Sequence, residues 1–265
     1  MSNTLLVDVQ TLLVSLALIT PRAYLCLSIL PALGSRTVVG IVRNAVAIAI
    51  ALPALLPTYH FVQEMQPGYM LAAALAFKEA AIGVLLGVLL SIPIWVAQSI
   101  GSILDTQRSP IQIQASNASI DQDASAVGAL LLQATVLVLI QSGLLVMMVR
   151  MLIESYGLWP AFSLMPPFES GHMEVMMQRF GVFFWHIAVY GGPVIIPLLL
   201  IDFGFAIVGV FASGLQVSFA SAPIKSLTGL FILLVYWAIL SHYISDDFAH
   251  MLDVPAQLFQ ATSKP

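Results

Sequence analysis

The sequence predicts an all-α membrane protein that is built from several apolar helices. Hydrophobic residues make up 60% of the 265 residues and charged residues only 8%, and the mean hydropathy is +0.98. A soluble domain carries about 25% charged residues, so lipid or other subunits must cover this chain. Helices are the expected elements because a bilayer core offers no hydrogen bonds to an open backbone.

Six apolar segments follow one another along the chain, and we expect each of them to be helical. They fall at roughly 5–33, 38–57, 70–104, 126–153, 180–213 and 227–244. About 20 residues span a hydrocarbon core, so the third and fifth segments are too long for one straight span. Pro93 lies in the third segment, and Pro193 and Pro197 lie in the fifth. We expect these helices to bend or split at their prolines.

Three polar connections lie between these segments, at 33–43, 105–125 and 154–179. If all six segments cross the membrane, the loops that hold Arg36, Arg43, Arg108 and Lys225 share one side. The acidic loop 154–178 and the tail with Asp246, Asp247 and Asp253 then lie on the other. The positive-inside rule then predicts that the basic side is cytoplasmic.

The composition excludes several classes of function. The net charge of −4 provides no basic patch for nucleic acid. Cys26 is the only cysteine, which excludes an internal disulfide and a cysteine metal cluster, so we expect a packed apolar side chain. The sequence has no phosphate loop, nucleophile elbow or nucleotide fingerprint, and we expect no cofactor and no catalytic residues.

A histidine pattern near the C-terminal end leaves a membrane-embedded enzyme as a rival reading. His242, Asp246 and His250 are spaced four residues apart, so one helix face can carry all three. A metal site needs convergence and a fourth ligand, which the sequence does not provide. We therefore expect no metal site here.

Charged residues inside apolar runs need partners, because a charge that faces lipid costs about 2.5–3.5 kcal/mol at mid-bilayer. These residues are Lys78, Glu79 and Asp202. Pairing inside an assembly is one reading, and a helix end that lies at the membrane interface is another. The alternative is a secondary transporter in which they form an ion pathway and the helix break at Gly191–Pro193 forms a substrate site. No clear internal repeat supports that alternative.

Two stretches resemble the FliR/SctT family, a core subunit of the flagellar and virulence type III secretion export gate. The first is KEAAIGVLLGVLLSIPIWVAQSIGSILDTQRS at 78–109, and the second is LQVSFASAPIKSLTGLFIL at 215–233. The chain reads Asp-Thr-Gln-Arg-Ser from Asp105, without the Gly-Phe that flagellar members usually show after this aspartate. This difference favours the virulence branch.

The resemblance implies a non-enzymatic subunit of the bacterial inner membrane, embedded through an export gate complex and touching lipid. Its partners would be FliP/SctR-type, FliQ/SctS-type and FlhB/SctU-type subunits, together with unfolded exported polypeptides. One copy would close a helical, cone-shaped channel assembly. Residues 1–175 would be FliP-like and would contain a polar plug loop at 106–125, and residues 180–265 would form a FliQ-like helical hairpin.

The resemblance also implies roles for individual residues. The plug would be polar with few charges, so that a passing chain meets only weak, exchangeable hydrogen bonds. The expected plug residues are Gln107, Arg108, Gln112, Gln114, Ser116, Asn117 and Ser119. The expected residues of assembly and helix packing are Lys78, Glu79, Gly83, Gly87, Gly101, Asp105, Asp202, Pro223, Lys225 and Gly229. Gly83 and Gly87, four residues apart, let a neighbouring helix approach closely.

The stretch APIKSLTGL at 222–230 predicts the start of the last helix. We expect Pro223 to end or bend the preceding helix, and Ser226 or Thr228 to cap the next one. Lys225 would then stand near a helix start, where the dipole disfavours a cation. We expect its partner to be a carboxylate or a helix C-terminus on an adjacent subunit, with snorkelling to lipid headgroups as the alternative.

Overall fold

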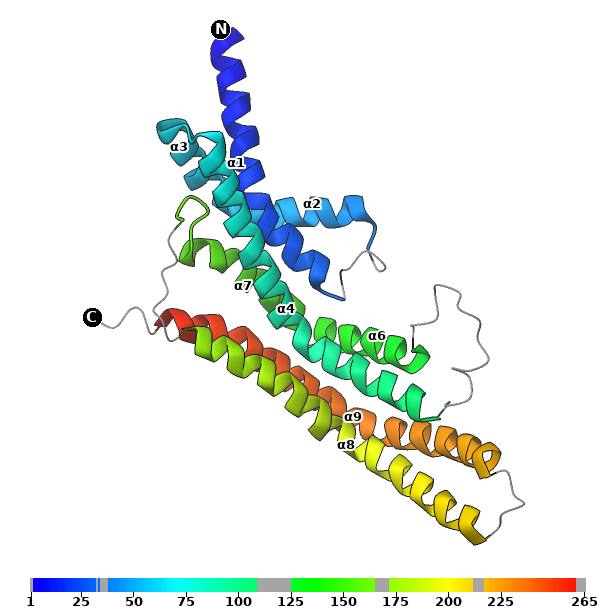
Figure 1. Ribbon diagram of the computed structural model, residues 1–265. Helices are drawn as coiled ribbons and strands as arrows, with labels where there is room; N and C mark the ends of the chain where they lie inside the picture. Colours follow the sequence, from blue (N-terminus) through cyan, green and yellow to red (C-terminus); the bar gives the residue numbers. More distant parts are fainter. Residues whose placement is uncertain are drawn as a thin grey trace. The chain divides into compact units, whose positions relative to one another are not determined.

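The computed structural model describes residues 2–31, 33, 38–108, 125–164, 172–211 and 217–260, and its regular elements there are all helical. This confirms the predicted fold class. Figure 1 labels the helices along the chain. They are α1 (Ser2–Ile29), α2 (Gly40–Ala51), the 3-10 turn η1 (Leu52–Ala54), α3 (Leu55–Met65), α4 (Tyr69–Arg108), α6 (Ala126–Gln141), α7 (Leu144–Leu158), α8 (His172–Phe211) and α9 (Val217–Gln260).

The chain divides into two compact units, and each is described by itself. The first comprises Met1–Ile92, Ile140–Met176 and Phe248–Pro265, and the second comprises Pro93–Leu139 and Met177–Asp247. The division expected from the resemblance, 1–175 and 180–265, concerns likeness to two other subunits and stays a prediction.

Five helical stretches in the described part of the chain are long and apolar enough to cross a membrane, and a sixth is added if the bent pair α6 and α7 counts as one span. The two stretches of α8 and α9, Phe184–Phe211 and Ser221–His250, bury few of their residues within the chain. Only 11% and 22% of their most apolar windows are buried within the chain. Lipid or other proteins must therefore cover these two helices.

In the first unit, α1 packs closely against α4. A Cβ atom added to Gly83 would lie 2.4 Å from the backbone oxygen of Arg22, and one added to Gly87 would lie 3.0 Å from that of Cys26. Only glycine permits such a close approach of two helix backbones. Cys26 is a fully buried free thiol in this contact.

In the second unit, α8 and α9 lie side by side as an antiparallel hairpin (Figure 1). Two polar contacts join them, from Lys225 to Asp202 and from His186 to Asp247. The hairpin also exposes large apolar residues, among them Phe203, which is 66% exposed.

Several expected element boundaries differ in the structure. Helix α4 continues to Arg108, so Asp105 and Gln107 belong to a helix and not to the polar connection. The segment 126–153 is not one helix, because the chain turns between Gln141 and Leu144. Gly143 has a φ of +71° there, a left-handed conformation that glycine adopts without strain.

The prolines do not end the long helices. Pro93 lies inside α4, and Pro193 and Pro197 lie inside α8, each of which continues as one 40-residue helix. Pro223 does not end a helix either, because α9 begins at Val217 and includes it. A long apolar helix can absorb the lost hydrogen bond of a proline by local adjustment. Consequently Ser226 and Thr228 lie within α9 and do not cap its start.

Candidate functional site

A buried ion cluster in the first unit contains three charged side chains. Nη2 of Arg22 and Nζ of Lys78 each lie 2.7 Å from the same carboxylate oxygen of Glu79. Arg22 and Glu79 are completely buried, and Lys78 is 9% exposed. Glu79 therefore compensates two cations that a buried environment would otherwise strongly disfavour.

Arg22 also binds the C-terminal end of α7. Its Nη1 donates to the carbonyl of Ser155 at 2.7 Å, and its Nη2 donates to the carbonyl of Trp159 at 2.7 Å. The guanidinium lies over the ring of Tyr156, 4.4 Å from the centroid. The last carbonyls of a helix have no partner within it and carry partial negative charge. A buried arginine thus caps α7 and ties it to α1 and α4.

Lys78 holds the turn that follows α7. Its ammonium group donates to three backbone carbonyls at 2.9, 3.2 and 3.0 Å. They belong to Pro160, Ala161 and Ser163. Because both cations and the carboxylate are bonded inside one unit, this geometry favours a structural joint over the ion pathway of a transporter.

The base of the polar segment is held together in the second unit. Oδ2 of Asp105, near the end of α4, accepts hydrogen bonds from Oγ of Ser125 at 2.5 Å and from the amide of Val127 at 2.8 Å. Oγ of Ser125 in turn accepts from the amide of Gly128 at 2.8 Å. Ser125 therefore caps the start of α6, and a carboxylate at this helix end suits its dipole.

Two glycines bring α4 and α6 together at the same place. A Cβ atom on Gly101 would lie 2.6 Å from the Cα atom of Gly128. The neighbouring side chains of Ile100 and Leu104 are buried. The two ends of the polar segment are therefore fixed to one compact joint.

The predicted plug residues lie mostly outside the described residues. Gln107 is half-buried in the last turn of α4, and Arg108 is its last residue. The residues beyond the described part are Gln112, Gln114, Ser116, Asn117 and Ser119. Their assignment to a plug stays a prediction.

The hairpin carries its own ion pair. Nζ of Lys225 lies 2.8 Å from Oδ1 of Asp202, with the lysine side chain 5% and the aspartate 40% exposed. The expected partner on an adjacent subunit is thus replaced by a carboxylate of the same chain, and Lys225 stands in the third turn of α9 and not at its start. Gly229 lies against Leu104: a Cβ atom added to Gly229 would lie 2.9 Å from Cδ1 of Leu104.

Sequence reasoning missed a second polar contact in the hairpin. Nδ1 of His186 lies 2.6 Å from Oδ2 of Asp247, and the rings of His186, Tyr190 and Tyr243 are stacked. It also missed Arg22 and Ser125. The signal for Arg22 was visible, because it is the only charge after Asp8 in the first apolar segment.

The histidine pattern of α9 forms no metal centre in the described residues. His242 pairs with Asp246 at 3.3 Å, and both side chains are largely exposed. No group of three His, Cys, Asp or Glu side chains with metal-binding geometry occurs in the described part of the chain.

The fold and these contacts define a multi-helix membrane protein whose charged residues join helices to one another. A comparison with family models gives its family. The chain belongs to the bacterial export proteins, family 1, whose model matches residues 13–251.

Individual relatives agree with this membership. The chain is 28% identical over 229 residues to the Yop proteins translocation protein T of Yersinia pestis, covering 86% of this chain and 87% of that protein. It is 30% identical over 236 residues to the surface presentation of antigens protein SpaR of Salmonella typhimurium, covering 87% and 86%. It is also 27% identical over 247 residues to the secretion system apparatus protein SsaT of the same species, covering 91% and 95%.

These matches confirm the resemblance to the FliR/SctT family. The chain is a component of the type III secretion export apparatus. The family and the apolar helices together make it a protein of the bacterial inner membrane.

Proposed function

We propose that this chain is a non-enzymatic core subunit that closes the channel assembly of a type III secretion export gate. One copy would join FliP/SctR-type and FliQ/SctS-type subunits, and would contact the FlhB/SctU-type subunit. Unfolded polypeptides would pass through the channel so formed.

The observation that carries this proposal is the joint at Asp105. It ties the end of α4 to the start of α6, so both ends of the polar segment 106–125 begin from one fixed base. A polar segment that is anchored at both ends can occupy a channel without being drawn along with the exported chain. Its glutamine, asparagine and serine side chains would form only weak hydrogen bonds with that chain.

The exposed apolar surface supports a role inside a complex. Large side chains of the hairpin remain accessible in the isolated chain, including Phe211, Leu227 and Leu234 at 86%, 76% and 76%. Partner subunits that bury these side chains would gain about 25 cal/mol per Å² of apolar surface. The transporter alternative is less favoured, because Lys78, Glu79 and Asp202 are already bonded within the chain.

Deleting Gln112–Ser119 tests the sealing role. Cells that carry the shortened chain should leak ions across the inner membrane, since the seal of the closed gate would be incomplete. The measurement is ion conductance of membranes or of the reconstituted complex, with the intact chain as reference.

Co-purification separates assembly from sealing. The shortened chain should still purify with the FliP/SctR-type and FliQ/SctS-type subunits, because the deletion leaves the Asp105 joint intact. Normal assembly with unchanged leak would contradict the plug. If the intact chain did not associate with these subunits, the gate role itself would be contradicted.

A further inference from the structure

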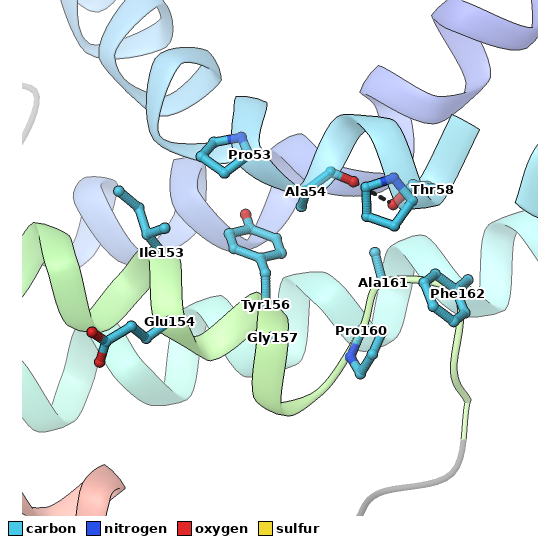
Figure 2. Close-up of a pocket in the computed structure, with 11 residues that line it drawn as sticks. Pro53, Ala54, Thr58, Ile153, Glu154, Tyr156, Gly157, Pro160, Ala161 and Phe162 are labelled. Atoms are coloured by element: carbon cyan, nitrogen blue, oxygen red, sulfur yellow. Dashed lines mark hydrogen bonds between the residues drawn. The ribbon is translucent and has the colours of Figure 1, made fainter. Parts of the chain in front are cut away.

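A pocket of about 260 Å³ lies in the first unit, beside the ion cluster. Its wall residue Tyr156 lies under the guanidinium of Arg22, and the carbonyls of Pro160 and Ala161 accept from Lys78. The walls of the pocket come from η1 and α3 on one side, and from α7 and the turn after it on the other. Figure 2 shows Tyr156 of α7 reaching toward Pro53 and Ala54 of η1, with Pro160 and Phe162 at the other end.

The walls offer hydrocarbon surface. The hydroxyl of Thr58 donates to the carbonyl of Ala54 at 2.7 Å, and the hydroxyl of Tyr156 donates to the carbonyl of Ile19 at 2.7 Å. These two polar groups are therefore already bonded to the protein. A polar ligand would lose hydrogen bonds to water here without replacement, whereas an apolar chain would not.

One charged residue, Glu154, lies at the edge of this pocket. Glu154 is a wall residue and pairs at 2.8 Å with Arg150, which lies one helical turn away and does not line the pocket; the two side chains are 57% and 79% exposed. Exposed charges are costly within the hydrocarbon core, so this edge lies at the level of the lipid headgroups or in water. A pocket that is apolar inside, with Glu154 at its edge and Arg150 beside that glutamate, matches a zwitterionic phospholipid, whose phosphate suits the arginine and whose ammonium suits the glutamate.

We propose that this pocket binds one acyl chain of a phosphatidylethanolamine molecule, with the headgroup at Arg150 and Glu154. The volume is below the range of about 300–1,000 Å³ that is typical of sites for whole ligands, so it suits part of one chain. This site is independent of the plug and would be present whether or not residues 106–125 seal a channel.

Gly157 provides a substitution that blocks the pocket without strain. It lines the pocket, and a Cβ atom there would meet no other atom within 4 Å. Gly157→Leu should therefore occupy the space that the acyl chain needs. Gly204→Leu is the matched control, because Gly204 on α8 is equally open and lies outside the pocket.

The experiment measures lipid that is retained by the purified export complex. After delipidation and incubation with phosphatidylethanolamine vesicles, native mass spectrometry counts the bound lipids. Gly157→Leu should lower the occupancy of one bound lipid about tenfold. This is the loss of affinity expected when roughly two methylene groups of the acyl chain are no longer buried in the pocket. Gly204→Leu should retain the occupancy of the unchanged chain. Equal occupancy in Gly157→Leu and the unchanged complex would overturn the proposal.

Two further variants identify the headgroup and the occupant. Replacing Arg150 and Glu154 together by alanine should remove any preference for phosphatidylethanolamine over phosphatidylglycerol, and an unaltered preference would refute the headgroup assignment. A photoreactive amino acid at position 157 should give an adduct of lipid mass. A cross-link to another subunit, or to another part of this chain, would show that protein fills the pocket and would overturn the lipid site.

Discussion

Arg22 and Glu79 form a fully buried ion pair of 2.7 Å between α1 and α4, although 57 positions separate them in the sequence. Through Arg22 and Lys78 the same carboxylate is linked to the carbonyls at the end of α7. Three helices of the first unit thus depend on one buried network.

Glu79→Gln should destabilise the assembled complex by about 3–5 kcal/mol, because two buried cations would lose their compensating charge. The measurement is the apparent free energy of unfolding of the purified complex in detergent. Glu154→Gln is the control, since the exposed Arg150–Glu154 pair contributes only about 0.3–0.5 kcal/mol. Equal effects of the two substitutions would contradict the assigned role of the buried network.

Gly83→Ala should force α1 away from α4, because its new methyl group would lie 2.4 Å from the backbone oxygen of Arg22. Overpacking of this kind costs about 1–3 kcal/mol, which thermal unfolding of the complex can detect. Gly68→Ala, where the added group meets nothing within 4 Å, should change stability by no more than about 0.5 kcal/mol. A stable Gly83→Ala complex would show that the helices do not approach so closely.

Asp105→Ala should loosen the start of α6. The substitution removes the acceptor of the Val127 amide and of the Ser125 hydroxyl, a loss of about 1 kcal/mol for a helix cap. Hydrogen exchange of the Val127 amide should then be roughly fivefold faster, while Asp105→Asn, which keeps an acceptor, should have a smaller effect. Unchanged exchange in Asp105→Ala would exclude this capping contact.

The two partners of the hairpin pair should respond unequally. Asp202→Asn leaves the ammonium of Lys225 buried and without a counter-charge, whereas Lys225→Met leaves a carboxylate that is 40% exposed. We expect Asp202→Asn to reduce the yield of intact complex more than Lys225→Met does, because an uncompensated buried charge is the more costly. Comparing the two yields in one host provides the measurement, and the opposite order would rule out this pairing.

Hydropathy was sufficient to predict the helical class and the main apolar segments. Hydropathy predicted the ends of the helices less well. Polar residues at the ends of long helices can continue the helix in water or at the membrane surface. Asp105 and Gln107 therefore join α4, and the residues before Lys225 join α9. The turn at Gly143 was missed, although Ser142–Gly143 interrupts an otherwise apolar segment.

The charged partners could not be predicted from spacing. Lys78, Glu79 and Asp202 were recognised as charges in need of partners, but the partners are chosen by how distant helices pack. Arg22 meets Glu79 only because Gly83 lets α1 approach α4. In the same way, Ser125 meets Asp105 beside the close contact of Gly101 and Gly128.

The subunit composition of the purified export complex tests the central claim most directly. Native mass spectrometry should find a single copy of this chain, bound to several copies of FliP/SctR-type and FliQ/SctS-type subunits. Several copies of this chain in one complex would contradict its role as the closing subunit. A stable, lipid-surrounded monomer without those partners would contradict the account as a whole.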